Sequence, residues 1–256
     1  MRLLFAVVAL ACVLVATGVW LRPRLPAAER GRRIAERAGC FACHGAEGSR
    51  GTANPGRKDA SVPTWEGDLM MFAEDEDEVR EWIRDGVPAE RGRSRTWQAE
   101  RDSGALRMPA FGRRLSRAQI EDLVVFVRAV GGEPAPAEVA ARRGGERARE
   151  LGCAGCHGPG GRFARPNPGS FKGYVPPWDG ADFSELVRGR AEFDQWVEEG
   201  MSRRFARDPL ARFFLDRATM RMPAYRRFLR PGDLDSLWAY MRWLRGATPA
   251  AGARTP

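Results

Sequence analysis

The chain has 256 residues, of which 43% are hydrophobic and 29% are charged, and its formal net charge is +9. The apolar fraction excludes a disordered chain, and the length allows one large domain or two of ordinary size. Only two histidines, His44 and His157, and five cysteines are present. This scarcity excludes a Ser/His/Asp triad with a spare base and most multi-histidine metal sites.

The basic excess consists almost entirely of arginine. Of the 42 basic residues only Lys58 and Lys172 are lysines, and the basic side chains are scattered among 33 acidic ones. Nucleic-acid-binding surfaces instead cluster Lys and Arg on one face or along one helix. We therefore expect no nucleic acid among the partners.

The amino-terminal segment is the most apolar part of the chain. Residues 3–21 carry no charged side chain and are bracketed by arginines. As a helix they span about 28 Å, close to the thickness of the hydrocarbon core of a bilayer. We predict that residues 1–24 form a membrane anchor. The alternative is a cleaved signal peptide, although the apolar stretch is long for one and no A-x-A cleavage site follows it.

The remainder consists of two copies of one pattern. GRRIAERAGCFACHG from Gly31 returns as GGERARELGCAGCHG from Gly144, and the motifs NPG, VPTW or VPPW, and RMPA follow in the same order in both copies. Such self-similarity indicates two repeated structural units. We predict domains over 25–132 and 144–246, a linker over 133–143 and a disordered tail over 247–256.

Helical periodicity runs through both copies, and strand signals are almost absent. Apolar residues at helical spacing predict a helix before each cysteine motif, one in the middle of each copy and one at its end. The middle helices, 75–85 and 192–199, are each followed by a glycine, Gly86 or Gly200. The expected fold class is therefore all-α. The Trp-containing inserts over 65–107 and 178–221 remain unassigned.

Both histidines stand in a C-x-x-C-H motif, which is the attachment site of c-type haem. Two thiols one helical turn apart can add to the two vinyl groups of the macrocycle, and the adjacent imidazole then falls below the iron. We predict two covalently attached haem c groups, with four thioethers and two histidine iron ligands. The residues are Cys40, Cys43 and His44 in the first copy and Cys153, Cys156 and His157 in the second.

Other uses of these cysteines fit less well. A redox C-x-x-C pair is expected in a βαβ context, which is missing. Two structural zinc sites lack a fourth ligand repeated in both copies. Disulfides leave the repeated histidine unexplained.

The second axial ligand is predicted to be methionine. No third histidine exists, and Met108 and Met222 occupy equivalent places in the repeated RMPA motif. A thioether ligand raises the reduction potential of haem iron, and the proline that follows restricts the backbone around each sulfur. The alternative is that these methionines fill the core, as we expect for the other internal ones.

At this point the chain resembles the class I (His/Met) cytochromes c in a tandem two-haem form. The resemblance covers residues 31–132 and 144–246 and rests on the C-x-x-C-H and RMPA motifs. It implies that a proline carbonyl accepts the ring N–H of each haem-binding histidine, and Pro55 and Pro168 match that place. It also implies that the first helix of each copy crosses the last one at a small residue, for which Gly31 and Gly144 are suited.

Several further polar side chains have two interpretations. Four tryptophans at repeated positions either donate to haem propionates or pack in the core. Two arginines at repeated positions either pair with propionates or are solvated. The tryptophans are Trp65, Trp82, Trp178 and Trp196, and the arginines are Arg107 and Arg221.

These features together predict an electron-transfer protein rather than an enzyme. With histidine and methionine on both irons, no position remains for a small-molecule substrate. We expect a membrane-anchored dihaem cytochrome of a respiratory chain, either a carrier or a haem subunit of a larger oxidoreductase. Its partners are then redox proteins. Because bacteria attach c haem on the outer side of the inner membrane, both haem domains are expected in the periplasm.

Two other functions remain open. A dihaem enzyme of the peroxidase or thiosulfate dehydrogenase type is possible if one axial methionine is absent from the iron or can be displaced from it. A haem-based sensor requires an output domain, for which the sequence offers no candidate.

Overall fold

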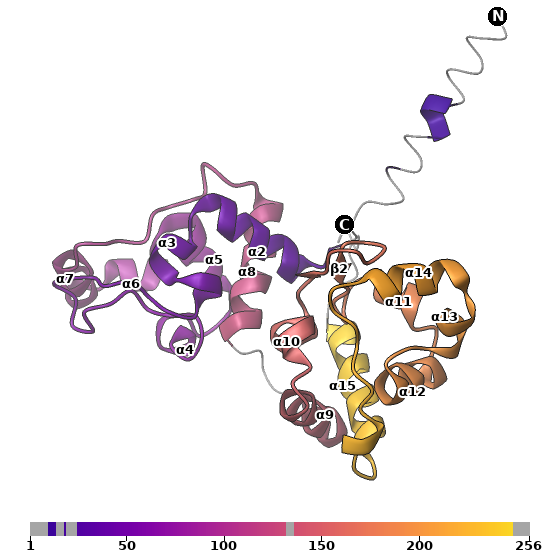
Figure 1. Ribbon diagram of the computed structural model, residues 1–256. Coiled ribbons are helices and arrows are strands. Elements are labelled where there is room, and N and C mark those ends of the chain that lie inside the picture. The colour runs from indigo at the N-terminus through magenta and orange to yellow at the C-terminus, as the bar shows by residue number, and fades with distance from the viewer. Residues whose placement is uncertain (1–9, 14–17, 19–24, 132–135, 248–256) are drawn as a thin grey trace, which may run out of the picture.

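The computed structural model describes residues 10–13, 18, 25–131 and 136–247, and it is mostly helical (Figure 1). The predicted membrane anchor lies almost entirely outside the described residues, and so does the predicted tail apart from Ala247. Among the residues that are described, no helix is both long and apolar enough to cross a membrane.

The first copy begins with a long helix and ends with a longer one, with six short elements between them. The elements are α2 (Ala27–Ala38), α3 (Phe41–His44), η1 (Ala46–Gly48), α4 (Leu69–Phe72), α5 (Glu76–Asp85), α6 (Ala89–Arg93), α7 (Arg95–Ser103) and α8 (Arg117–Gly131).

The second copy follows the same order and adds a minimal hairpin and a 3-10 turn. Its elements are α9 (Val139–Glu150), α10 (Ala154–His157), η2 (Pro159–Gly161), β1 (Arg165–Pro166), β2 (Tyr174–Val175), α11 (Phe183–Leu186), α12 (Arg190–Glu199), α13 (Arg203–Arg207), α14 (Pro209–Arg217), η3 (Arg226–Phe228) and α15 (Asp233–Ala247). The two strands are antiparallel, with Arg165 opposite Val175.

Each copy is built on a crossing of its first and last helices at a glycine. A Cβ atom on Gly31 of α2 would lie 2.0 Å from the carbonyl oxygen of Asp122 in α8. A Cβ atom on Gly144 of α9 would lie 1.9 Å from the carbonyl oxygen of Ser236 in α15. No larger residue fits at such an approach, so the helix crossing expected at these two glycines is confirmed.

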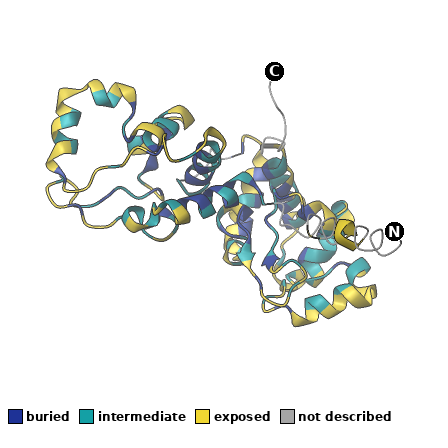
Figure 2. Cartoon of the chain, turned by 90° about the horizontal axis from the view of Figure 1, so that it is seen from above, coloured by how far each residue is buried: buried dark blue, intermediate teal, exposed yellow. Residues whose placement is uncertain are grey.

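The middle helices end where the sequence indicates. Gly86 follows α5 with φ 78° and Gly200 follows α12 with φ 75°, the left-handed conformation that glycine adopts at helix ends. The helices that follow them, α6 and α7 in the first copy and α13 and α14 in the second, contain no buried residue. Figure 2 shows such segments as yellow and teal ribbon at the periphery of the molecule.

The inserts between these helices repeat one set of hydrogen bonds. The indole N–H of Trp82 donates to the carbonyl of Phe72 at 2.8 Å, and the indole N–H of Trp196 donates to the carbonyl of Leu186 at 3.0 Å. Each acceptor is the last residue of a short helix, α4 or α11. Each insert is therefore tied back to its middle helix by the same tryptophan.

The two copies contact each other through an aromatic side chain. Phe163 of the second copy is 1% exposed and belongs to the hydrophobic core of the first copy. Its ring centroid lies 5.6 Å from that of Phe126 in α8. Beside it, the Arg165 guanidinium donates two hydrogen bonds to the Glu47 carboxylate, at 2.5 and 3.0 Å. This interface combines a buried ring with an ion pair at its edge.

Candidate cofactor site

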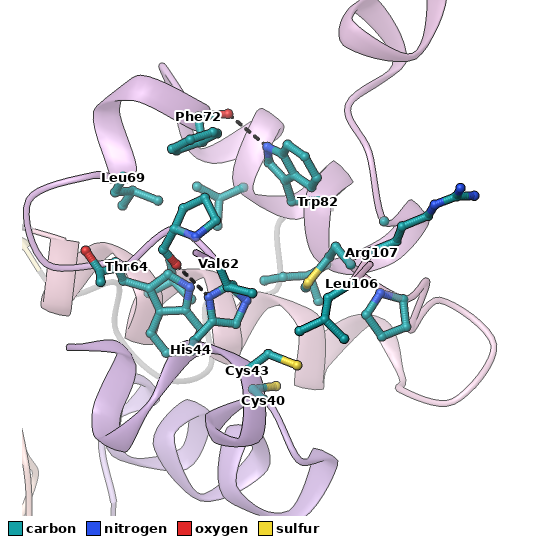
Figure 3. A pocket seen from close by; sticks show the side chains of 18 of the residues that line it. Cys40, Cys43, His44, Val62, Thr64, Leu69, Phe72, Trp82, Leu106 and Arg107 are labelled. Carbon is teal, nitrogen blue, oxygen red and sulfur yellow. Dashed lines mark hydrogen bonds between the residues drawn. The ribbon is translucent and has the colours of Figure 1, made fainter. Parts of the chain in front are cut away.

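A cavity opens in the first copy beside α3, α5 and α8 (Figure 3). It encloses about 1300 Å³, including the space at its open mouth. Its walls are largely apolar, as is usual where a protein buries most of a large organic ligand. The walls include Leu69, Phe72, Val79, Ile83, Phe111 and Leu123.

One helical turn brings three predicted ligands to this cavity. Cys40, Cys43 and His44 all line it. The turn is bounded by two glycines in the left-handed region, Gly39 with φ 80° and Gly45 with φ 72°. These glycines let the chain enter and leave this turn sharply, so that Cys40, directly before α3, faces the same cavity as Cys43 and His44 within it. In the second copy, Gly152 and Gly158 bound α10 in the same way.

The first cysteine of each motif is not an activated thiol. Burial raises the pKa of the Cys40 thiol to about 11 and that of the Cys153 thiol to about 11. Redox-active C-x-x-C pairs depend on a lowered thiol pKa, so these values argue against that alternative. The described residues also contain no group of three or more His, Cys, Asp or Glu side chains placed to hold a metal ion, as the zinc alternative requires.

A backbone carbonyl and an indole ring fix the orientation of His44. Its Nδ1 lies 3.0 Å from the carbonyl oxygen of Pro63, and its ring stacks on that of Trp65 with centroids 4.9 Å apart. Burial lowers the pKa of this imidazole and favours its neutral form. With the proton on Nδ1 donated to the carbonyl, Nε2 keeps a free lone pair for a metal.

His157 of the second copy has the same surroundings. Its Nδ1 lies 3.2 Å from the carbonyl oxygen of Pro176, and its ring centroid lies 5.0 Å from that of Trp178. Burial lowers its pKa to about 4. Each copy therefore presents one neutral imidazole, held by the proline and tryptophan of its VPxW motif.

The expectation that Pro55 and Pro168 hold the histidines is wrong. The acceptors are Pro63 and Pro176, which follow their histidines by 19 residues. The carbonyls of Pro55 and Pro168 point elsewhere, because the NPG turn directs them to the chain that leads to the methionine. The prolines whose carbonyls accept from the histidines belong to the repeated VPxW motif.

The NPG turn clamps the segment before Met108. The Asn54 side chain is 2% exposed, donates to the carbonyl of Leu106 at 3.0 Å and accepts from the amide of Leu106 at 2.8 Å. The Pro55 carbonyl accepts from the amide of Ala105 at 2.9 Å. Met108 follows two residues after Leu106 and lines the same cavity as His44.

The second copy repeats this clamp around Met222. The Asn167 side chain donates to the carbonyl of Met220 at 3.0 Å and accepts from its amide at 2.8 Å. Met220 therefore stands where Leu106 stands in the first copy, and Met222 stands where Met108 stands. Met222 packs against the core of its own copy.

A helix end supports each methionine from the other side. A Cβ atom on Gly86 would lie 2.6 Å from the carbonyl oxygen of Met108, and one on Gly200 would lie 2.5 Å from that of Met222. The amide of Phe111 also donates to the carbonyl of Ile83 in α5 at 3.0 Å. The loop that carries each methionine is thus held on one side by the asparagine side chain and on the other by the glycine at the end of the middle helix.

The remaining predicted polar residues bond within the protein. Trp82 and Trp196 donate to backbone carbonyls, while Trp65 stacks on His44 and Trp178 lies tilted against His157. The side chains of Arg107 and Arg221 are 56% and 62% exposed, and each lies 3.6 Å from an aspartate carboxylate, Asp102 or Asp216.

The residues of the first cavity fit a c-type haem. Two thiols on one helical turn, a neutral imidazole and a thioether form the donor set, and apolar side chains form the walls. One buried donor at the cavity, the Nε–H of Arg57, has no hydrogen-bond partner in the described chain. Sequence reasoning missed Arg57 because it lies outside the repeated motifs.

Comparison with known protein families supports this interpretation for the first copy. Residues 28–131 match the model of the Cytochrome c family. The match begins in α2, ends at the last residue of α8 and includes the cysteine motif, the asparagine clamp and Met108. No curated protein sequence matches the chain.

Proposed function

Because residues 28–131 form a cytochrome c domain, the kind of domain that carries haem-based electron transfer, we propose that the whole chain is a dihaem electron-transfer cytochrome of a respiratory chain. The observation that carries this proposal is the repetition of the site around His157. The same carbonyl contact, asparagine clamp and glycine helix end recur there. The second copy is then a second cytochrome c domain, with Cys153 and Cys156 as its thioether residues.

The chain's own residues hold and orient the cofactor in this proposal. Bound haem supplies a metal that gains and loses one electron. Cys40 and Cys43 would hold it covalently, and the Pro63 carbonyl orients His44 so that Nε2 would be the ligand atom. The clamped loop delivers the sulfur of Met108. With His44 and Met108 both bound to the iron, no position would remain for a substrate, which favours a carrier or complex subunit over an enzyme.

Ligand replacement tests the axial assignments. The oxidised protein should show the weak near-infrared band of sulfur-to-iron charge transfer, and Met108→Ala and Met222→Ala should each remove about half of it. Met220→Leu is the matched control and should leave the band unchanged. If neither alanine variant reduces the band, the ligand assignment fails. Rapid binding of carbon monoxide to the reduced native protein would instead favour the enzyme alternative.

The amino-terminal segment is proposed to anchor the protein in the bacterial inner membrane, with both haem domains in the periplasm. The support is the uncharged length of residues 3–21 and the outer-side attachment of c haem. The proposed partners are a membrane respiratory complex and a soluble carrier.

Fractionation tests the anchor. The native chain should remain in washed membranes, whereas a chain with residues 1–24 replaced by a cleavable export signal should be released as a soluble haem protein. A native chain found in the soluble periplasmic fraction would contradict the anchor and support a cleaved signal peptide.

A further inference from the structure

A row of aromatic rings leads from His44 to the surface where the two copies meet. His44 stacks on Trp65 with ring centroids 4.9 Å apart, and Trp65 meets Phe126 edge-on at 5.5 Å. Phe126 in turn meets Phe163 of the second copy edge-on at 5.6 Å. The tryptophan and both phenylalanines are buried, so the row runs through the protein interior rather than along its surface.

The last ring of this row belongs to a residue that is hydrogen-bonded to the other histidine. The amide of Phe163 donates to the carbonyl oxygen of His157 at 3.1 Å. A Cβ atom on Gly158, the residue after His157, would lie 2.6 Å from Cβ of Phe163, so the two chain segments approach closely there. The two histidines are therefore joined by a continuous series of three ring contacts and one hydrogen bond.

The last helix of the first copy lacks an aromatic residue that its counterpart has. The crossing glycines align Phe126 of α8 with Tyr240 of α15, since each of these two side chains lies at the crossing. Tyr240 stacks on Trp243, from the next turn of the same helix, with centroids 5.8 Å apart. The corresponding residue of α8 is Ala129. The second copy thus supplies, through Phe163, an aromatic neighbour that the next turn of α8 does not.

Beside the row, a residue in an unfavourable conformation joins the two copies. Glu47 has φ 55°, in the left-handed region that residues with a side chain rarely adopt. The corresponding residue of the second copy is Gly160, with φ 61°. The Glu47 carboxylate accepts both hydrogen bonds from Arg165 of the second copy. Backbone strain of this kind persists where the surrounding contacts hold it, so the ion pair marks a defined placement of the two copies.

We propose that this row of contacts is the route by which an electron passes between the two haem sites, and that Phe163 closes the gap between the copies. The inference rests on the proposed function. One electron leaves the reduced iron of one site and enters the oxidised iron of the other, and no bond or proton is transferred. An electron passes between fixed groups more readily through packed and bonded atoms than across empty space, and a buried row of side chains leaves no such space. Phe163 is then a positioning residue, since it binds neither iron.

The competing arrangement has each site exchanging electrons only with other molecules. Transfer from one site to the other then requires an encounter between two proteins, and its rate rises with protein concentration. Transfer along the row of rings occurs within one molecule, so its rate is independent of protein concentration. The two arrangements therefore differ in a measurable way.

NMR exchange spectroscopy of the partly reduced full holoprotein tests the route. The rate is read from exchange between the haem methyl signals of the oxidised and reduced forms of each site, and it should not change on dilution. Phe163→Leu keeps an apolar side chain but removes the ring, and it should slow the exchange several-fold. Phe126→Leu should do the same, whereas Phe126→Tyr keeps a ring, as Tyr240 does in the second copy, and should retain the wild-type rate.

Two further variants separate the rings from the general closeness of the copies. Glu47→Gln weakens the ion pair and leaves the row of rings intact, so its exchange rate should stay near that of the wild type. Phe228→Leu removes an exposed ring of the second copy and should have no effect. The midpoint potentials of both sites should stay in place in all variants, because none of these residues binds an iron.

The outcomes separate the route from the proposed function. Haem content, measured first, shows whether the wild-type chain carries two haem groups, and a chain with one overturns both. If two are present, exchange that slows on dilution overturns the route alone, and so does a fall in Glu47→Gln equal to that in Phe163→Leu. Unchanged rates in Phe163→Leu and Phe126→Leu also overturn it. Should Phe163→Leu fail to fold or to retain both haem groups, the comparison of Phe126→Leu with Phe126→Tyr decides.

Discussion

Asn54 fixes the backbone two residues before Met108, although it touches no ligand atom. Its amide group forms a closed pair of hydrogen bonds with one residue, Leu106, inside the protein. Because the side chain is buried, water cannot easily replace either bond.

Replacing this side chain should loosen the methionine. We expect Asn54→Ala to lower the free energy of unfolding by about 2–4 kcal/mol, since two hydrogen bonds are lost and the backbone of Leu106 is left unsatisfied. Urea unfolding measures this loss, and the near-infrared band should disappear at a lower temperature than in the wild type. Asn54→Asp retains the acceptor oxygen, so its free energy of unfolding should lie between those of the wild type and of Asn54→Ala. A loss below about 0.5 kcal/mol in the alanine variant would contradict the clamp.

At this scale the sequence could predict that Cys40, Cys43, His44 and Met108 lie together, as they do in the wall of the first cavity, but it could not predict what holds them there. The C-x-x-C-H spacing is local, so it brings Cys40, Cys43 and His44 to one turn whatever the rest of the chain does. Which carbonyl reaches His44 depends on the path of a loop, and Pro63 rather than Pro55 lies there. Arg57 carries no motif, and only its burial distinguishes it from a solvated arginine.

At the scale of elements, α12 and α13 are joined by one strong ion pair. Arg204 donates to Glu192 at 2.7 and 3.0 Å, and the amide of Arg188 donates to the same carboxylate at 2.9 Å. Chiefly because of the bond from Arg204, the pKa of Glu192 is lowered to about 2.

This pair should make stability depend on pH in the acid range. The folded-state pKa lies below the ordinary value, so the stabilisation is present above about pH 4.5 and is lost as the pH falls towards 2. Allowing for solvent screening, we expect Glu192→Gln to cost about 1–2 kcal/mol at pH 6 and progressively less between pH 4 and pH 2.5.

Urea unfolding of both proteins across this pH range measures the difference. Glu36→Gln, which alters an exposed carboxylate 3.5 Å from Arg32, is the control and should change the free energy by less than about 0.5 kcal/mol at each pH. A pH-independent gap for Glu192→Gln would contradict the assignment.

The long and the capped helices could be predicted from the sequence, whereas the short surface helices could not. Helix α8 carries an apolar stripe from Ile120 to Val127, and α5 ends at a glycine, so both have local signals. Helices α7 and α14 bury no residue, and the apolar side chains of Leu210 and Phe213 in α14 stay exposed. Each begins at a cap residue, Ser94 for α7 and Asp208 for α14, whose side chain accepts hydrogen bonds from backbone N–H groups of the first turn.

At the scale of the whole molecule, Phe163 makes the stability of one copy depend on the other. Its ring fills space in the core of the first copy although it belongs to the second. Nothing in the sequence distinguishes this phenylalanine from one buried in its own copy, so this contact could not be predicted.

Truncating this ring should destabilise the first copy. We expect Phe163→Ala to cost about 3–5 kcal/mol because it leaves a cavity beside Phe126. Hydrogen exchange of amides in α8 locates the loss in the first copy, and urea unfolding gives its size. Phe228→Ala removes a ring that is 65% exposed and should cost less than about 0.5 kcal/mol. Unchanged exchange in α8 would contradict the contact.

The same contact bears on symmetry. Phe163 of one unit contacts α8 of the other, so the two repeats associate head to tail rather than about a two-fold axis. A head-to-tail contact between identical units can be repeated indefinitely unless the units at the two ends differ. The ends do differ. Arg50, an exposed residue, occupies the position of Phe163 in the first copy, and each residue donates its amide to the carbonyl of the copy's histidine. The first copy therefore offers a charged side chain where a further unit in the same arrangement would require an aromatic one.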